Sequence, residues 1–379
     1  CVNKIPPFDV SEQYKLIGEA LNAAATEVLA SGRYIGGPAV EQFEQQFAQY
    51  IGTADCIACN SGTDALYLAL RALNIGPGDE VITTPFTFIA TAEVISAVGA
   101  TPVFVDISLE SFNLDLAQVE AAVTPRTRAV IPVHLFGNPV DMTRLMAIAQ
   151  AHNLYVVEDC AQATGATWGD QKVGSIGQIG CFSFYPTKNL GACGDGGAIT
   201  TNDPAIAERL RRLRDHGRRG AYYYEELGVN SRLDAIQAAI LQIKLPHLDT
   251  WNQQRHAIAT RYQELLAPIP GLVVPQATVG GHSVWNQYTV RVLQADPAAA
   301  TPERDRLRSQ LQANGITAMV YYPLCLHLQP AYQHLGYQAG QLPNAEQASQ
   351  EVLSLPMFPE LTTAQQQQVV YALKDCVCS

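Results

Sequence analysis

The segment Cys181-Phe-Ser-Phe-Tyr-Pro-Thr-Lys188-Asn-Leu-Gly191 places a lysine on a short turn that follows an apolar strand. A second apolar run, Leu154-Tyr-Val-Val-Glu-Asp159, predicts a buried strand with a carboxylate at its carboxyl end. A pyridoxal 5'-phosphate (PLP) site needs a lysine that forms a Schiff base and an aspartate that keeps the pyridine nitrogen protonated. The two segments therefore predict a PLP site with Lys188 and Asp159 as its catalytic residues.

A cradle for the cofactor's phosphate is expected earlier in the chain. Asp55–Asn60 has β character, and Ser61-Gly-Thr-Asp64 then opens an apolar helical stretch. The first backbone N–H groups of a helix lack partners within it, and the helix dipole favours an anion there. Gly62, which permits a tight turn, Thr63 and Asp64 are therefore expected to bind the phosphate. Taken alone, Ser-Gly-Thr would indicate only a helix cap.

The chain resembles the nucleotide-sugar aminotransferases of the DegT–StrS family over nearly its whole length. The matching segments are Ser31–Pro38, Ser61–Leu66, Gly76–Phe88, Val156–Ala163, Phe182–Asn189, Gly228–Ala239 and Tyr321–Gln329. Their number and order make the family assignment specific, whereas the match to any one sugar is weaker. The resemblance implies an α/β fold of the fold-type-I PLP enzymes. Such a fold has a three-layer large domain with a mainly parallel sheet and a smaller C-terminal α+β domain.

The pattern of the chain agrees with that architecture, because helical and strand-like stretches alternate between about residues 40 and 210. Strands are expected at Glu80–Thr83, Thr101–Val105, Ala129–His134, Tyr155–Glu158 and Gly180–Ser183, and helices at Ile89–Val98, Leu116–Ala122 and Asp141–Ala151. A long helical pattern begins near Asp234, is interrupted at Pro246 and resumes over Trp251–Leu266. We place the domain junction there, with a PLP-binding domain over residues 1–248 and a small domain over residues 249–379.

The resemblance assigns further cofactor contacts. It implies that Phe88 stacks on the pyridine ring; the alternative is that the residue is a core aromatic. Gln162 is expected within reach of the ring's phenolic oxygen, since a polar residue in this Ala-rich stretch would otherwise carry an unexplained burial cost. Ser183 could donate its hydroxyl to the phosphate or be an ordinary strand serine.

Two residues are expected to act across a subunit boundary. In the family, the residue matching Asn230 reaches the cofactor phosphate of the neighbouring subunit, and the residue matching Arg232 faces the substrate. The alternative is that Asn230 caps the following helix and Arg232 lies on the surface. If the resemblance holds, the working unit is a homodimer with shared active sites.

The expected substrate-binding residues are Arg232, Tyr34, Tyr321, Tyr322 and His327. Aromatic residues beside a proline are also common in plain loops, which is the alternative for the segment around Pro323. The resemblance implies transfer of an amino group from glutamate to a nucleotide-linked keto-sugar, for surface polysaccharide or amino-sugar biosynthesis, with PLP cycling through pyridoxamine 5'-phosphate (PMP). The keto group is at C3 or C4, and the segments Thr84–Phe88 and Gly228–Arg232 favour C3.

Three alternatives are open. Sugar dehydratases of the family replace the Schiff-base lysine, typically with histidine, so Lys188 argues for transamination. A desulfurase or amino-acid lyase of the same fold would explain Asp159 and Lys188 but not the segments around Arg232 and Tyr322. A non-enzymatic homologue that has kept the fold is disfavoured by the intact cofactor residues.

Composition excludes other classes of protein. The chain has 379 residues, is 47% hydrophobic and carries a formal charge of −11, which disfavours nucleic-acid binding. No run approaches the ~18 apolar residues of a membrane span, and no signal peptide is visible, so a cytoplasmic enzyme is expected. The nine cysteines are expected to be reduced thiols without a metal. Cys56 and Cys59 are three residues apart on a predicted strand and so point to opposite faces.

Overall fold

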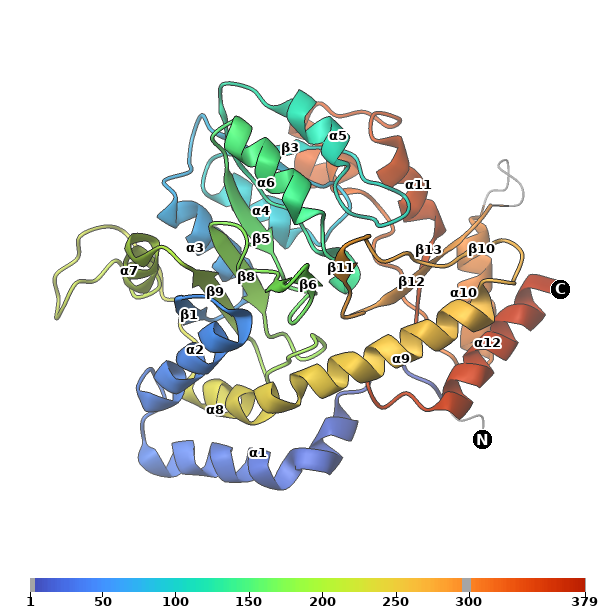
Figure 1. Ribbon diagram of the computed structural model, residues 1–379, viewed down its shortest axis with the longest axis horizontal. Helices are drawn as coiled ribbons and strands as arrows, with labels where there is room; N and C mark the ends of the chain where they lie inside the picture. The colour runs from blue at the N-terminus through green and yellow to red at the C-terminus, as the bar shows by residue number, and fades with distance from the viewer. Residues whose placement is uncertain (1–3, 295–300, 379) are drawn as a thin grey trace.

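A seven-stranded sheet forms the centre of the larger lobe of the computed structural model, which describes residues 4–294 and 301–378 (Figure 1). In spatial order its strands are β1 (Asp55–Cys59), β9 (Gly197–Thr201), β8 (Ile179–Ser183), β5 (Tyr155–Asp159), β4 (Thr127–Val130), β2 (Glu80–Thr83) and β3 (Thr101–Phe104). The strands from β8 to β3 run parallel, and β9 is antiparallel to both β8 and β1. The predicted α/β class with a mainly parallel sheet is confirmed.

Helices cover both faces of this sheet. They are α1 (Ser11–Ser31), α2 (Pro38–Ile51), α3 (Gly62–Ala72), α4 (Ala90–Ala97), α5 (Leu116–Val119), α6 (Met142–Ala151), α7 (Pro204–Leu213) and α8 (Ala235–Lys244). The side chains of β1 alternate between two cores, with Cys56 packed beside α2 and α8 and Cys59 packed beside α3 and α7. This confirms that the two thiols point to opposite faces, as the two-residue period of a strand requires.

A smaller lobe follows, built on an antiparallel sheet of β10 (Leu272–Val273), β12 (Tyr288–Val292) and β13 (Val352–Leu355). Its helices are α10 (Glu303–Ala313), α11 (Pro343–Glu351) and α12 (Thr363–Cys378). The long helix α9 (Leu248–Leu266) runs from α8 to this lobe (Figure 1). Ile5 lies in the core of the smaller lobe and bridges to Ile316, so the N-terminal segment packs there. The division at residue 248 stays a prediction.

A third, small sheet joins β11 (Gly281–His282) to β6 (Thr167–Trp168) and β7 (Gln171–Lys172). It therefore links the segment before β12 to the segment that follows Asp159. No helix in the described ranges is long and apolar enough to cross a membrane.

The expected strand at Ala129–His134 is wrong at its carboxyl end, because β4 ends at Val130. Pro132 cannot donate a hydrogen bond to a ladder, and the chain continues as a single bridge from Val133 to Asp159 before a 3₁₀ turn. The helix expected from Asp234 begins at Ala235, with Asp234 in the capping position. Asn230 lies outside that helix and bridges to Asp215, so the alternative role of Asn230 as a helix cap is wrong.

Candidate active site

Asp159 is the last residue of β5 and lies at the carboxyl edge of the parallel strands, where sites of open α/β sheets form. One carboxylate oxygen accepts a hydrogen bond from Thr91 Oγ1 at 2.8 Å, and the other accepts one from the Ala161 N–H at 3.1 Å. Burial raises the pKa of the Asp159 carboxyl, and these hydrogen bonds and the charge of Lys188 oppose that rise. Thr91, on α4, is a site residue that the sequence did not reveal.

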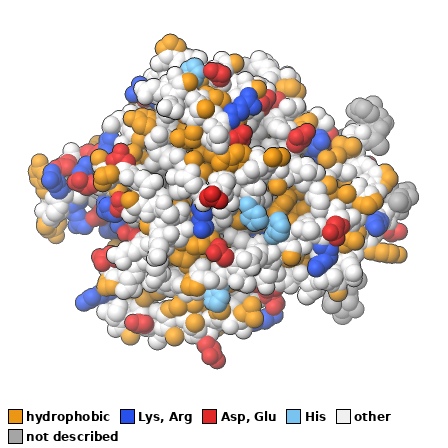
Figure 2. Space-filling model, viewed as in Figure 1, with side chains coloured by type: hydrophobic (Ala, Val, Ile, Leu, Met, Phe, Trp, Pro, Cys, Tyr) orange, Lys and Arg blue, Asp and Glu red, His pale blue; other side chains and the backbone are white. Residues whose placement is uncertain are grey.

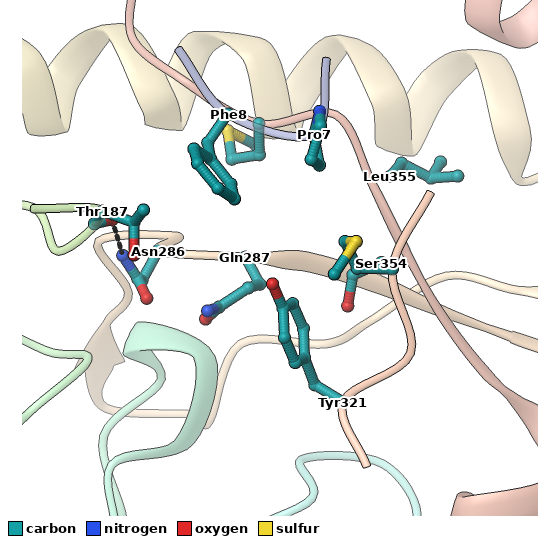
Figure 3. A pocket seen from close by; sticks show the side chains of 10 residues that line it. Pro7, Phe8, Thr187, Asn286, Gln287, Tyr321, Ser354 and Leu355 are labelled. Carbon is teal, nitrogen blue, oxygen red and sulfur yellow. Dashed lines mark hydrogen bonds between the residues drawn. The ribbon is translucent and has the colours of Figure 1, made fainter. Parts of the chain in front are cut away.

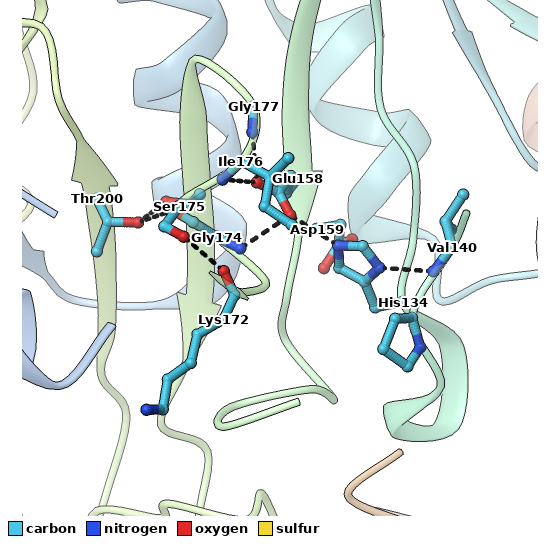
Figure 4. A network of polar contacts seen from close by, with 12 residues as sticks. His134, Val140, Glu158, Asp159, Lys172, Gly174, Ser175, Ile176, Gly177 and Thr200 are labelled. Atoms are coloured by element: carbon cyan, nitrogen blue, oxygen red, sulfur yellow. Dashed lines mark hydrogen bonds and ion pairs between the residues drawn. The ribbon is translucent and has the colours of Figure 1, made fainter. Parts of the chain in front are cut away.

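Behind Asp159, the fully buried Glu158 fixes the backbone around it (Figure 4). Its carboxylate accepts hydrogen bonds from His134 Nε2 at 3.0 Å and from the N–H groups of Gly174, Ile176 and Gly177. His134 Nδ1 accepts the Val140 N–H at 3.0 Å. Cys160 lies near these groups, but the carboxylate and both ring nitrogens already have protein partners, so the cluster is satisfied without an ion.

Lys188 lies on the turn after β8, the strand that pairs with β5. Its backbone N–H donates to the Tyr185 carbonyl at 2.8 Å, which fixes the turn. Its amine makes no hydrogen bond or ion pair with any residue in the described ranges. Burial lowers the pKa of this amine to about 8, against the opposing effect of the Asp159 charge. A lysine that is partly neutral near physiological pH can act as a nucleophile and as a base.

The amino end of α3 lies against the end of β8 and offers a set of hydrogen-bond donors. Ser61 caps the helix by accepting the Asp64 N–H at 3.1 Å, as the cap signal predicted. Within the described part of the chain, the N–H groups of Gly62 and Thr63 have no protein partner. The Ser183 side chain packs directly on Gly62. Two free N–H groups at a helix start beside a hydroxyl fit a phosphate group.

The reason for a glycine at position 62 differs from the predicted one. Its backbone is not left-handed, so no tight turn demands it. Instead, a Cβ atom at this position would lie 2.6 Å from Ser183 Cβ and 3.2 Å from Ser183 Cα. The glycine is required because helix α3 and strand β8 approach each other closely.

We therefore expect Gly62→Ala to weaken phosphate binding. The added methyl group must push α3 away from β8, at a cost of about 1–3 kcal/mol, and the affinity for PMP should fall by roughly tenfold. Gly76→Ala is the matched control, because its Cβ would meet nothing closer than the Val98 carbonyl at 3.5 Å. Both are checked by titrating PMP into the apoprotein. An unchanged affinity in Gly62→Ala would contradict a phosphate site at this helix start.

The remaining expected cofactor residues are placed as follows. The Phe88 side chain is 57% exposed, which rules out the alternative of a core aromatic and leaves its ring free to stack on a ligand. Gln162 is buried and satisfied: its Oε1 accepts the Phe136 N–H at 2.7 Å, and its Nε2 donates to the Tyr322 hydroxyl at 3.3 Å. The burial cost expected at Gln162 is therefore met by protein partners.

The structure brings only some of the predicted substrate residues close together. Tyr321 and Tyr322 lie edge to face with ring centroids 5.8 Å apart, and the hydrogen bond to Gln162 brings Tyr322 to the Asp159 segment. His327 is 1% exposed and pairs with Glu346 at 3.1 Å. A substrate role for His327 therefore has no support from the geometry.

Asn230 and Arg232 line a polar cavity of about 420 Å³ together with Asn60 and Asp195. Arg232 also forms an ion pair with Asp215 at 3.2 Å. Tyr34 is half exposed, and its backbone carbonyl accepts the N–H of Ala235 at the start of α8. Tyr34 and Arg232 thus lie near the amino end of α8. They take no part in the contacts that join Tyr321, Tyr322 and Gln162.

The sequence profile of the DegT/DnrJ/EryC1/StrS aminotransferase family matches residues 15–374. The chain belongs to this family. It is 50% identical over 373 residues to a pleiotropic regulatory protein of Geobacillus stearothermophilus, covering 98% of each chain. It is 46% identical over 372 residues to the dTDP-3-amino-3,4,6-trideoxy-α-D-glucose transaminase of Streptomyces venezuelae, covering 98% of this chain and 96% of the other.

A solved structure supports the same relationship. The crystal structure of S. venezuelae DesV in complex with a ketimine intermediate matches with a TM-score of 0.94 and 46% identity, covering 99% of this chain and 98% of that chain. PLP and its amino form PMP are the cofactors that the family implies. The donor set at α3, the Asp159 carboxylate and the free Lys188 amine fit that group in the chemistry they offer: an anion site, a partner for a ring nitrogen and a nucleophile.

Proposed function

We propose that this chain is a PLP-dependent aminotransferase that moves an amino group, from glutamate, to the keto group of a nucleotide-linked sugar. The observation that carries the proposal is the placement of the Lys188 amine. It is partly buried, makes no hydrogen bond or ion pair with any residue in the described ranges, and is close enough to the Asp159 carboxylate for each to shift the other's pKa. Membership of an aminotransferase family supports the same function.

In this proposal the described residues have distinct roles. When bound, PLP supplies an electron sink that stabilises negative charge on the carbon atom from which a proton is removed. Asp159 holds a proton on the pyridine nitrogen. Gly62, Thr63 and Ser183 would bind the phosphate, and the exposed ring of Phe88 would stack on the cofactor ring. We assign the covalent attachment of the cofactor to Lys188. With an amino donor bound, the Lys188 Nζ would remove the proton from the donor Cα.

The proposal is tested by following the absorbance change from PLP to PMP. Purified protein is mixed with candidate nucleotide-linked amino sugars, which drive the reaction backwards and leave PMP on the enzyme. We expect one class of amino sugar, followed by 2-oxoglutarate, to carry the cofactor through a full cycle. If a panel of both uridine and thymidine diphosphate amino sugars leaves the spectrum of a PLP-loaded protein unchanged, the assignment to sugar amination is overturned.

The position of the keto group is proposed to be C3. The support is the 46% identity to a transaminase that is named for a 3-amino sugar, together with the segments Thr84–Phe88 and Gly228–Arg232. A C4 amino sugar that converts the cofactor faster than its C3 isomer would reverse this assignment.

A regulatory protein without enzymatic activity is the second candidate, and the name of the relative from G. stearothermophilus is the observation in its favour. The Lys188 amine counts against it, because partial burial of an amine that has no hydrogen-bond or ion-pair partner in the described ranges costs free energy without a structural return. The same absorbance assay separates the two candidates, since a protein that only regulates would not convert PLP to PMP with any amino sugar.

We also propose a homodimer with shared active sites. Asn230 is exposed and makes no side-chain hydrogen bond in the described ranges. The neighbouring loop carries Tyr222, Tyr223 and Tyr224, whose side chains are 88%, 63% and 55% exposed. This loop projects from the larger lobe beside α7, where charged and hydrophobic side chains are crowded together (Figures 1 and 2). An exposed aromatic cluster of this kind fits an interface between copies of the chain.

Subunit mixing tests the shared site. Inactive Lys188→Ala chains are mixed with chains that carry Asn230→Ala and Arg232→Ala. One of the two sites in each hybrid dimer then has every residue intact, so part of the activity should return. No recovery despite proven subunit exchange, or full activity in a monomer, would contradict sharing.

The reactivity of Lys188 should depend on pH in a defined direction. Its pKa is lowered from 10.5 to about 8, so the neutral, nucleophilic amine predominates above that pH. Covalent attachment of PLP to the apoprotein should therefore speed up as pH rises and reach half its maximal rate near pH 8. Attachment is measured by rapid borohydride reduction in amine-free buffers, with Lys188→Ala as the background. A rate still climbing at pH 10.5 would indicate an ordinary, solvated lysine.

A further inference from the structure

Three buried asparagines surround the turn that carries Lys188. Asn189, the next residue, uses its whole side-chain amide: its Nδ2 donates to Asn252 Oδ1 at 2.7 Å and to the Val284 carbonyl at 3.0 Å. Its Oδ1 accepts a hydrogen bond from Asn286 Nδ2 at 2.7 Å. The side chains of Asn189, Asn252 and Asn286 are 3%, 9% and 5% exposed. An extensively paired network of this kind is rigid, because breaking any bond leaves a buried polar group without a partner.

The network holds both neighbours of Lys188. Asn286 Nδ2 also donates to the carbonyl oxygen of Thr187, at 3.4 Å. The backbone is thus fixed immediately before Lys188, through Thr187, and immediately after it, through Asn189. These two anchors restrain the backbone from which the Lys188 side chain extends.

The same network reaches the segment that follows Asp159. Asn252 Nδ2 donates to the carbonyl oxygen of Thr164 at 3.1 Å. Asn252 lies on α9, and one turn later Arg255 donates from its Nη1 to the backbone carbonyls of Trp285, Asn286 and Met357 at 3.1 to 3.3 Å. Helix α9 therefore fixes the backbone of Asn286 as well as the amide of Asn189.

On its other side, Asn286 lines a small cavity with Gln287, Thr187 and Tyr321 (Figure 3). Asn286 Oδ1 and Gln287 Oε1 are both buried and have no hydrogen-bond partner in the described ranges. The two amides are adjacent in the chain and line one cavity, but in the described structure only Asn286 bonds to the lysine turn. This difference makes Gln287 a matched control for Asn286.

We propose that Asn189, Asn252 and Asn286 are positioning residues for Lys188. Through their hydrogen bonds, helix α9 sets the location of the lysine amine relative to Asp159 and connects the lysine turn to the smaller lobe. The inference rests on the proposed role of Lys188 in attaching the cofactor. It names residues outside the cofactor contacts: the phosphate donors at α3 and the ring partner Asp159 are held by other elements. Loss of the network should therefore slow covalent attachment of the cofactor at Lys188. It should leave unchanged the binding of the phosphate and the ring by the other residues.

The test compares two measurements on full-length apoprotein. One is the rate of covalent attachment of PLP at Lys188, read by borohydride reduction and peptide mass. The other is the affinity for PMP, which needs no bond to Lys188. For Asn286→Ala we expect attachment to slow by about tenfold or more and PMP affinity to change by less than about twofold. Gln287→Ala should leave both unchanged. The double variant Asn189→Ala with Asn286→Ala should slow attachment by less than the product of the two single effects, because the two side chains share one hydrogen bond and each also makes bonds of its own.

Several results would overturn the inference. Unchanged attachment in a folded Asn286→Ala protein is one, and parallel losses of attachment and PMP affinity, which indicate general distortion, are another. If Asn286→Ala does not fold, Asn252→Ala breaks the network from α9 and decides by the same two measurements. Failure of the unsubstituted protein to attach PLP at Lys188 would instead refute the proposed function. If the unsubstituted protein attaches PLP normally and the variants attach it at the same rate, only the positioning role is refuted.

Discussion

Replacement of Lys188 by alanine is expected to abolish turnover, with a loss on the order of ten-thousandfold or more. In the proposed mechanism the amine serves twice, as the point of covalent attachment and as the base that moves the donor's proton. In the described ranges Lys244 is the other lysine whose pKa burial lowers, but its amine donates to the Gly191 carbonyl at 2.8 Å and is not free. PMP should still bind to Lys188→Ala, because the phosphate donors and Asp159 are untouched.

The measurement is steady-state amination together with peptide mass analysis after borohydride reduction. Lys172→Ala is the control, since that amine lies over the Tyr50 ring at 4.5 Å and bears no relation to the site. A pyridoxyl adduct on Lys244 in the unsubstituted protein would contradict the mechanism. So would a Lys188→Ala enzyme that keeps more than a few per cent of its activity.

The second large effect is expected from Asp159→Asn, with a loss on the order of a thousandfold or more. Asparagine has the size of aspartate but no charge with which to hold a proton on the pyridine nitrogen. The fold should survive, because the amide oxygen can still accept the Ala161 N–H and the Thr91 hydroxyl can rotate to accept from the amide.

Asp170→Asn is the control, as this carboxylate is exposed on the turn between β6 and β7. The rates are compared at saturating cofactor, with thermal unfolding to check the fold. A near-normal rate for Asp159→Asn would mean that another group holds the ring nitrogen. A lower rate together with a lower melting temperature would instead point to a structural role for the carboxylate.

Local patterns were enough to predict the elements on which the site is built. Strand β2 has the expected bounds, and β5 and β8 were each predicted to within one residue, because short apolar runs with turn residues on both sides identify buried strands. The helix start at Gly62 followed from the capping signal of Ser61. The order along the chain of the Ser61–Asp64 segment, Asp159 and Lys188 then agreed with the order that the resemblance implies.

The sequence was less informative wherever a side chain depends on a distant partner. The burial of His327 against Glu346 depends on how the chain packs, and sequence spacing in a loop gives no measure of it. Gly62 was recognised, but its need for a small residue comes from Ser183, which is 121 residues later (183 − 62).

The fold class and the family could be predicted from the sequence, and Lys188 and Asp159 could be singled out as candidate catalytic residues, because these inferences rest on local periodicity and on short ordered motifs. The surroundings of these two residues depend on how distant parts of the chain pack together. Thr91 reaches Asp159 from α4, and Asn252 and Asn286 reach the lysine turn from 64 and 98 residues away along the chain (252 − 188 and 286 − 188). The first of these bonds depends on how α4 packs against the sheet, and the others depend on how α9 and the segment before β12 pack against the lysine turn, so no local pattern in the chain encodes them.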